Sequence, residues 1–479
     1  GFTGSHWNRP FLYTLDNLDT IRPVYNLQRK QTNSVYSTTD FSYKSFFNLG
    51  ITGRFDQFST LPKVNQGIFT YSVSASTAYT NFLKIPGINY GKLRLSYAQT
   101  SGEAETYLTS AYYQVYNGTV GGNPMGGLEV VVPPADLTPY RLKEYEIGTE
   151  LKMLGNRLGV DITYFDRHTE NELVKKRLSA ASGYLFSYEK SGITTNRGTE
   201  LMITANILQQ KKFHWSASFN FTQVNNKLVR INTRQSTSPV RKNGEGLYRP
   251  SAAPFNNGAF VANVEGLPVA QIMAYGYKYN DEGKMIIGED GIPVRGDLVA
   301  MGSGLPKYYG GLKNNFSYKK ISLSFLMDYK FGNKVLSGTD FMSYYYGLNK
   351  KTLIGRETGI VADGVQENGS PNTQSVPAQD YYKGLVSNIS TISVFNGGFI
   401  KLRQLGLSYQ FSPAQLQRTF LEEIKVSFFV RNVATLLKHT DNFDPEDNFS
   451  SLVGNAGLEG GTLPQVRTFG IDCNLKFKK

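Results

Sequence analysis

Hydrophobic and polar side chains alternate with a period of two over many segments of the chain. The last segment shows the pattern best, with an apolar set of Phe469, Ile471, Cys473, Leu475 and Phe477. Similar splits recur in segments 158–164, 215–222, 321–330 and 424–431. A period of two places alternate side chains on opposite faces of a β-strand. The chain is therefore predicted to be all-β, with about 14 antiparallel strands.

One segment changes the phase of this alternation. Its apolar residues move from even positions, Ile400 and Leu402, to odd positions that run from Leu405 to Phe411. One extra residue in a strand produces such a shift, so the pattern predicts a β-bulge near Arg403 and Gln404.

The connections between the expected strands alternate in length. Segments 154–157, 209–212 and 318–320 are short, whereas 101–139, 223–269 and 332–396 are long and rich in Gly, Asn, Pro, Ser and Tyr. Loops of that length are unusual in a compact soluble domain. Short periplasmic turns opposite long extracellular loops are typical of a transmembrane β-barrel, and several strands have the length of about 10 residues that crosses a bilayer. A soluble β-sandwich or an all-β adhesin alternates in the same way and remains the alternative.

Composition agrees with a barrel. The chain has 31 Tyr, 30 Phe and 48 Gly among its 479 residues, and only 19% of residues are charged. Its mean hydropathy of −0.33 suits strands that are apolar at every second position only. No run of about 18 apolar residues predicts a spanning helix. The first residues lack a signal-peptide pattern, so the sequence is expected to be a mature or truncated form.

Charge and reactive residues exclude several function classes. The net charge is +13, but Lys and Arg are spread along the chain, so no nucleic-acid partner is predicted. A basic lumen or a rim that faces lipopolysaccharide accounts for the charge. Cys473 is the only cysteine and falls on the lipid-facing stripe, and the four His residues have no metal-ligand spacing. We therefore predict no metal, no cofactor and no enzymatic activity.

A series of motifs then occurs in a fixed order. The series comprises a Glu-containing strand that turns at a Gly-Asn-Arg-Leu corner (142–165), Asn-Arg-Gly-Thr-Glu-Leu (196–201), and segments 304–316, 329–334, 359–382, 399–409, 444–446 and 464–477. Together they resemble the barrel of the SusC/RagA family of TonB-dependent outer-membrane transporters. The resemblance covers the chain from about residue 50 onward, a span that suits one large barrel.

The resemblance implies a barrel of about 22 strands, an N-terminal plug and a TonB-contacting segment. Residues 1–479 are then expected to be a C-terminal portion of the barrel domain, with the plug absent from the chain. The implied partners are a SusD-like surface lipoprotein, TonB through the missing N-terminal region, and outer-membrane lipid and lipopolysaccharide. The implied function is active import of oligosaccharides or oligopeptides across the bacterial outer membrane. The alternatives are a passive porin-like outer-membrane channel and, from another class, a surface adhesin or carbohydrate-binding β protein.

Candidate binding residues are tyrosines in the expected extracellular loops. They are Tyr112, Tyr113, Tyr116, Tyr344, Tyr345, Tyr346, Tyr381 and Tyr382. A tyrosine ring stacks on sugars and packs on peptides, although loop packing and an aromatic girdle at the membrane surface also use tyrosine. In such barrels a terminal aromatic residue is the signal for barrel insertion. Here Phe477 is followed by Lys478 and Lys479, so the signal is expected at Phe477, either displaced by two residues or capped by an added tail.

Two acidic stretches carry oxygen ligands of the kind that Ca²⁺ prefers. They contain Asp281, Glu282, Glu289, Asp290 and Asp297 in one case and Asp441, Asp444, Glu446 and Asp447 in the other. Neither has the ligand spacing of a calcium loop, so both are predicted to be solvated turns.

Overall fold

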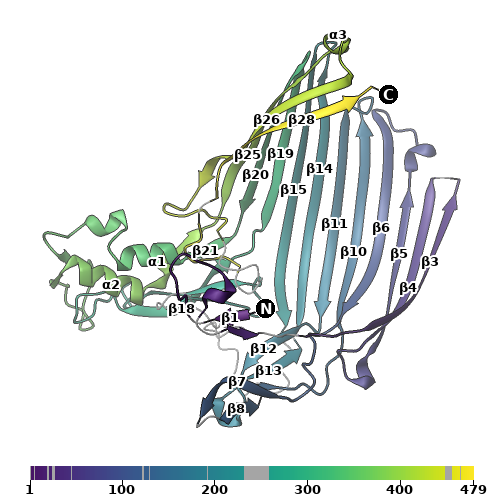
Figure 1. The fold of residues 1–479 in the computed structure, drawn as a ribbon. Helices are drawn as coiled ribbons and strands as arrows, with labels where there is room; N and C mark the ends of the chain where they lie inside the picture. The colour runs from purple at the N-terminus through teal and green to yellow at the C-terminus, as the bar shows by residue number, and fades with distance from the viewer. Residues whose placement is uncertain are drawn as a thin grey trace.

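The computed structural model is dominated by one large antiparallel sheet (Figure 1). It describes residues 2–4, 6–18, 21–23, 27–44, 46–120, 123–128, 130–190, 192–230, 258–447, 456–463 and 465–478. Within these residues the main sheet has 13 strands. They are β3 (Thr32–Tyr43), β4 (Phe47–Phe58), β5 (Gly67–Thr77), β6 (Ile88–Gly102), β10 (Tyr140–Met153), β11 (Leu158–Glu170), β14 (Ile193–Gln209), β15 (Phe213–Arg230), β19 (Tyr308–Tyr318), β20 (Ile321–Phe331), β25 (Phe399–Gln410), β26 (Leu421–Lys438) and β28 (Thr468–Phe477).

The order of strands in this sheet follows their order in the chain, from β3 at one edge to β28 at the other. Each strand pairs antiparallel with its neighbours, for example over 13 residue pairs between β10 and β11. An up-and-down meander of this kind is the arrangement of membrane barrels. The all-β prediction is confirmed, with 13 strands described where about 14 were expected.

The two faces of the sheet differ as the alternation predicted. One face, called the apolar face, carries large hydrophobic side chains that are exposed in the chain alone, among them Leu95, Ile147, Ile162, Leu323, Leu407, Phe428 and Ile471. Cys473 pairs with Val426 on this face. So broad an exposed apolar surface is rare on a soluble monomer, and lipid is the environment that suits it. Among the described residues, no helix has the length and apolar character needed to cross a bilayer.

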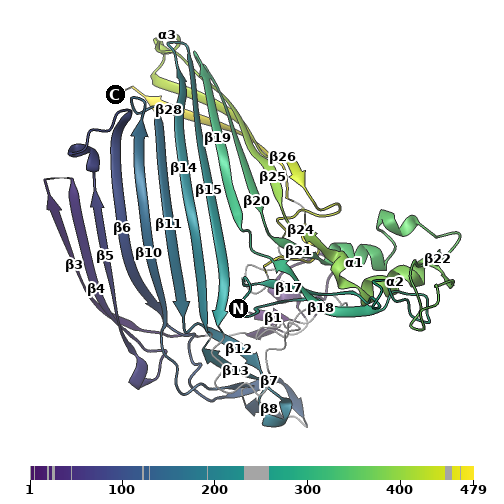
Figure 2. The same ribbon diagram turned by 180° about the vertical axis from the view of Figure 1, so that it is seen from behind.

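Tight turns join the strands at one end of the sheet, the upper end in Figures 1 and 2. Between β10 and β11, Gly155 and Asn156 both have φ of +66°, the left-handed conformation that tight hairpins require. The long connections gather at the opposite end in both views. The predicted division into short turns and long loops is therefore confirmed.

The predicted bulge lies in β25. Pairing of β25 with both of its neighbours shifts between Leu402 and Gln404, which leaves Arg403 as the extra residue. Because of this residue, Lys401, Arg403 and Gln404 all lie on the polar face, while Leu402 and Leu405 stay on the apolar face.

Smaller elements lie outside the main sheet. The strands are β1 (Phe2–Gly4), β2 (Ile21–Pro23), β7 (Tyr113–Val120), β8 (Asn123–Leu128), β9 (Val131–Val132), β12 (Leu173–Arg177), β13 (Phe186–Lys190), β16 (Phe260–Ala262), β17 (Gln271–Tyr277), β18 (Arg295–Ser303), β21 (Lys334–Ser337), β22 (Ile360–Val361), β23 (Ser375–Val376), β24 (Val394–Asn396) and β27 (Leu458–Glu459). The helices are α1 (Gly338–Tyr345), α2 (Ala378–Asn388), α3 (Pro413–Leu416) and the short 3₁₀ segments η1 (Leu15–Asn17), η2 (Lys63–Asn65), η3 (Tyr79–Asn81), η4 (Ala180–Ser182), η5 (Lys350–Leu353) and η6 (Ser390–Ser393).

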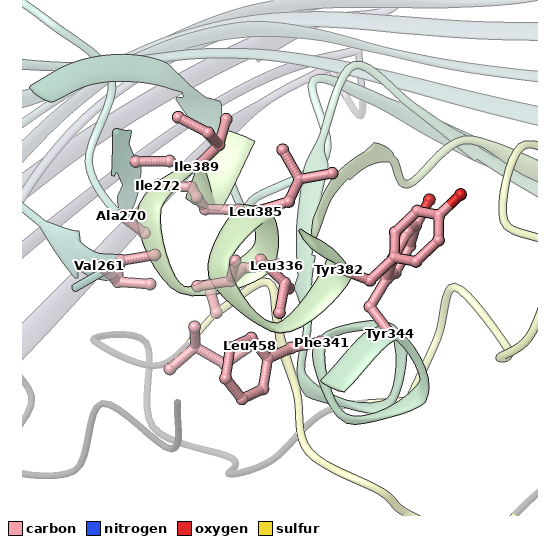
Figure 3. Close-up of a cluster of buried hydrophobic side chains, with 14 of the residues drawn as sticks. Val261, Ala270, Ile272, Leu336, Phe341, Tyr344, Tyr382, Leu385, Ile389 and Leu458 are labelled. Atoms are coloured by element: carbon pink, nitrogen blue, oxygen red, sulfur yellow. The ribbon is translucent and has the colours of Figure 1, made fainter. Parts of the chain in front are cut away.

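Three of the long connections share one hydrophobic core. They join β15 to β19, β20 to β25 and β26 to β28, and their described residues 258–307, 332–398, 439–447 and 456–463 are called the connector domain below. Ile272, Leu336 and Leu458 come from the three different connections and are at most 1% exposed. They pack in one cluster with α1 and α2 (Figure 3). These connections are thus a small packed domain rather than separate loops.

Candidate functional site

The polar face of the main sheet carries paired charges. The Arg94 guanidinium donates to both carboxylate oxygens of Asp161, at 3.0 and 2.6 Å. Arg167 does the same with Glu144, at 2.6 and 3.0 Å. Two-pronged pairs of this kind keep both charges satisfied in a partly buried place. The polar face is therefore suited to line a water-filled barrel interior.

At the loop end, the connection after β26 is bound to this polar face. The Lys401 ammonium, on a residue only 4% exposed, lies 2.6 Å from Asp444 Oδ1 and 2.7 Å from Glu446 Oε2. Arg403 pairs with Glu446 and, at 2.7 Å, with Asp328 of β20. The bulge in β25 is what brings Arg403 to the same face as Lys401. It therefore provides the second cation of this anchor.

The anchor changes the ionisation of Glu446. Burial by itself raises the pKa of this carboxyl, but hydrogen bonds from Arg403 and Lys401 outweigh it and lower the pKa to about 2. The prediction that Asp444 and Glu446 belong to a solvated turn is wrong, because both carboxylates are partly buried and ion-paired. The sequence did not reveal this pairing, because Lys401 on β25 lies 43 residues from Asp444 and 45 residues from Glu446.

A pocket of about 730 Å³ lies between α1 and α2 of the connector domain. Its lining includes Tyr344, Tyr345, Tyr346 and Tyr382, together with Arg356 and Lys383. Ser337 caps the start of α1 by accepting a hydrogen bond from Asp340 N at 3.0 Å. Gly347, with φ of +70°, follows the helix in the left-handed conformation that commonly ends one. These two local signals place three consecutive tyrosines at the end of a short helix.

Two of the pocket tyrosines are part of its wall. Tyr344 and Tyr382 are each 8% exposed, and their ring centroids lie 6.1 Å apart. Figure 3 shows their rings beside one another, at the edge of the buried cluster. The Tyr382 hydroxyl donates to the Lys351 carbonyl at 2.8 Å. Burial, with a contribution from Asp340, raises the pKa of Tyr344 to about 12, so its hydroxyl remains neutral at physiological pH.

The remaining lining residues give the pocket its accessible chemistry. Tyr346 is 67% exposed, and Tyr345 is partly buried with the Lys383 ammonium 5.5 Å from its ring centroid. The Arg356 guanidinium braces its own loop by donating to the Thr352 carbonyl at 3.0 Å. The pocket thus combines aromatic faces with two positive charges.

Charged residues from other connections hold both helices in place. The Glu459 carboxylate, on a residue 1% exposed, accepts from Thr339 N at 3.1 Å and from Ser337 Oγ at 2.5 Å at the start of α1. At the end of α2, Arg295 donates to the Asn388 carbonyl at 3.1 Å. A negative charge at the start of a helix and a positive charge at its end both interact favourably with the helix dipole.

The predicted tyrosines fall into two groups. Tyr344, Tyr345, Tyr346 and Tyr382 meet in the pocket, and Tyr381 lies next to them in α2 but packs toward the buried cluster. Tyr112 and Tyr113 are exposed in the connection between β6 and β10 and do not line this pocket. The backbone of Tyr116 lies in β7, and its side chain lies outside the described part of the structure.

Sequence reasoning missed Arg356 and Lys383. Lys383 directly follows Tyr382, so its place next to a predicted tyrosine was an available signal. Arg356 gave none, because its position depends on how the loop after α1 folds.

The remaining candidates from the sequence are the first acidic stretch and Phe477. The stretch from Asp281 to Asp297 forms turns, in which Asp290 Oδ1 accepts from Ile292 N at 3.1 Å and Glu282 pairs with Lys284 at 3.0 Å. Within the described ranges, no three His, Cys, Asp or Glu side chains are grouped so as to hold a metal ion. The Phe477 ring stacks on Phe420 at 5.8 Å, near the turn end of the sheet, and its role in barrel insertion remains a prediction.

Aromatic side chains form a row across the apolar face. The Tyr71 and Tyr97 ring centroids are 5.5 Å apart, and those of Tyr97 and Tyr145 are 4.6 Å apart. Tyr145 pairs in register with Asp166, which binds Arg197 at 2.9 Å. A tyrosine row next to an ion pair marks the edge of a lipid-facing band.

The fold and its two faces define a β-barrel protein of the bacterial outer membrane. The family model described as "TonB dependent receptor-like, beta-barrel" matches residues 1–433, so the chain belongs to the TonB-dependent receptor β-barrel family.

Similar proteins agree with this assignment. TonB-dependent receptor P3 of Formosa agariphila is 25% identical over 96% of this chain and 47% of its own length. TonB-dependent receptor P39 of the same organism is 23% identical over 98% of this chain and 49% of its own length. The chain thus spans about half the length of these curated relatives.

Solved structures share the fold. A structure of the RagAB peptide transporter matches with a TM-score of 0.71 and 18% identity, over 96% of this chain and 48% of the other. The RagAB peptide importer in its "closed-closed" state matches with a TM-score of 0.73 at the same identity and coverage. At this level of identity, the likeness supports the fold and leaves the ligand open.

Proposed function

We propose that this chain forms part of the barrel wall of an outer-membrane importer. The importer takes up nutrient oligomers, either oligosaccharides or oligopeptides, with energy supplied through TonB. The observation that carries the proposal is a meandering sheet with one apolar and one ion-paired polar face, which the TonB-dependent receptor barrel model matches over residues 1–433. The chain has a transport role in this scheme and takes no part in catalysis.

The main sheet supplies part of the barrel. In the described structure, β3 and β28 each pair with a neighbour on one side only. Unpaired strand edges are not tolerated in a bilayer, so further strands must close the barrel. We therefore propose that residues 1–479 are a C-terminal portion of the barrel domain and that the plug belongs to a region outside them.

The connector domain lies at the loop end, where substrate arrives. A SusD-like surface lipoprotein is the partner that we propose there, on the basis of the SusC/RagA resemblance. The pocket tyrosines, Tyr345 and Tyr346 above all, are proposed to contact the substrate. Tyr112, Tyr113 and Tyr116 remain proposed contacts in a separate connection.

Uptake measurements in the native host test this function. Deletion of the gene should abolish uptake of a fluorescent oligosaccharide or oligopeptide, and a protonophore should have the same effect on the wild type. Uptake that persists with the protonophore would favour a passive porin. A protein that leaves the membrane without detergent and supports no uptake would instead be an adhesin.

A further inference from the structure

The pocket between α1 and α2 has a charge bias that the proposed function does not require. Among the described residues, its charged lining residues are Arg356 and Lys383, and no acidic side chain lines it. Two carboxylates at α1 are engaged elsewhere: Glu459 accepts hydrogen bonds at the start of the helix, and Asp340 Oδ1 accepts from Asn349 at 3.0 Å. The two cations therefore face the pocket without a lining carboxylate to neutralise them.

Of the two cations, Lys383 is the one whose charge can be tested without disturbing a loop. Its ammonium lies 5.5 Å from the Tyr345 ring centroid, and within the described residues no carboxylate forms a salt bridge with it. Two exposed lysines of the same domain have carboxylate partners, since Lys284 pairs with Glu282 and Lys278 with Glu367. A cation held against an aromatic face keeps its charge available to a ligand.

Arg356 has a second role that must be separated from ligand binding. Its Nε and Nη2 atoms donate to the Thr352 carbonyl at 3.0 Å and to the Gly347 carbonyl at 2.5 Å, which closes the loop after α1. A guanidinium has five N–H donors, so donors remain for a ligand after these bonds are made. Replacement of Arg356 would disturb the loop as well as the charge.

We propose that this pocket is a subsite for the anionic groups of the substrate, in which a carboxylate or sulfate meets Lys383 and Arg356 while the attached ring or apolar body stacks on Tyr345 and Tyr346. The inference rests on the proposed import function and narrows its substrate to acidic oligomers. An acidic sugar and an acidic peptide share this chemistry, and the aromatic faces accept either one.

Calorimetric titration of the full-length transporter with its native partners in detergent tests the subsite. The probes are trigalacturonic acid with its neutral counterpart galactotriose, and a glutamate tripeptide with the matched glutamine tripeptide. We expect at least one acidic probe to bind about tenfold more tightly than its neutral match, with the preference shrinking as salt rises from about 50 to about 500 mM. Preference for the acidic sugar alone or the acidic peptide alone would identify the source.

Substitutions then assign the preference to the pocket. Lys383→Gln leaves the described hydrogen bonds of both helices intact and should reduce the acidic preference by about tenfold. Lys284→Gln removes an exposed lysine of the same domain and should leave the preference unchanged. Equal binding of acidic and neutral probes, absence of binding by both acidic probes, or an equal effect of the two substitutions would overturn the proposal.

Failure of this subsite and failure of the import function give different results. TonB-dependent uptake without any charge preference would refute the anionic subsite and leave import standing. A clear charge preference in a protein whose uptake survives the protonophore would refute energised import instead.

Discussion

Two buried charges of this protein, Lys401 and Glu459, meet partners from distant parts of the chain. Lys401 meets Asp444 and Glu446, and Glu459 meets the start of α1, 120 residues away. Burial of such groups without a partner would cost several kcal/mol, so each contact also specifies where a connection must lie. The charges therefore determine the position of the connections as well as their stability.

Loss of Lys401 should release the connection after β26 from the polar face. Lys401→Met leaves Asp444 partly buried without its main partner, and we expect a cost of about 3 kcal/mol. Hydrogen exchange should show lost protection in residues 439–447. Lys330→Met is the matched control, because this lysine is more exposed and lies 3.4 Å from Glu446; it should cost less than about 1 kcal/mol. Equal effects of the two substitutions would contradict the proposed anchor.

Asp340 gives the connector domain a dependence on pH. Burial, reinforced by Asp441 and Glu459 and opposed by Lys351 and Asn442, raises the pKa of Asp340 from 3.8 to about 6. The folded state therefore binds this proton more tightly than the unfolded state does. The contribution of Asp340 to the stability of the domain should be highest below about pH 4 and should fall as pH rises through about 6.

Asp340→Asn should remove this dependence. Its amide oxygen can still accept the hydrogen bond from Asn349, while the buried charge is lost. We expect a gain of about 1–2 kcal/mol near pH 8 and no gain near pH 4. Hydrogen exchange of α1 across this range is the measurement, with the exchange of β10 and β11 as the internal reference. A gain that is the same at both pH values would argue against titration of Asp340.

At the scale of elements, the strands are determined by the alternation of apolar and polar residues. A few glycine positions also allow neighbouring side chains and backbone to approach closely. Gly198, in the Asn-Arg-Gly-Thr-Glu-Leu motif, lies beneath the Phe165 ring and against the Gln223 carbonyl, where a Cβ would collide. In the same motif, Arg197 pairs with Asp166 on the apolar face. The motif thus combines a packing requirement with a marker of the membrane boundary.

Two adjacent residues of β26 test the assignment of the faces. Phe428 lies on the apolar face, where it pairs with Leu407 and Ile471, and Ser427 lies on the polar face between Ser408 and Asp472. Phe428→Arg should cost about 2–4 kcal/mol, because it places a charge in lipid, whereas Ser427→Arg should cost little. Urea unfolding in lipid vesicles measures both costs. A greater cost for Ser427→Arg would mean that the faces are reversed.

At the scale of the whole molecule, the barrel wall and the connector domain are stabilised differently. The wall relies on strand pairing and lipid, whereas the connector domain has its own buried cluster (Figure 3). Within the connector domain, Gly304 packs directly against the backbone of Ala456 and Gly457. We expect the two parts to lose structure in separate steps.

Leu336→Ala should separate these steps. Leu336 is fully buried in the cluster, so its truncation should cost the connector domain about 2–5 kcal/mol. Hydrogen exchange should rise in β17, α1, α2 and β27 while the strands of the main sheet keep their protection. Leu348→Ala is the control, since Leu348 is 79% exposed and its loss should matter by less than about 0.5 kcal/mol. Increased exchange throughout the main sheet would show that the molecule unfolds as one unit.

The sequence by itself determined the strands, their two faces, the bulge at Arg403 and the division into turns and loops. These features follow from alternation and turn residues within short segments, because lipid on one side and water on the other demand a period of two. Only the tertiary structure decided that three long connections form one domain, that Asp444 and Glu446 bind Lys401, and that Arg356 and Lys383 join the tyrosines in one pocket. Contacts such as that between Ser337 and Glu459, 122 residues apart, leave no periodic trace in the chain, because they depend on how complete elements pack.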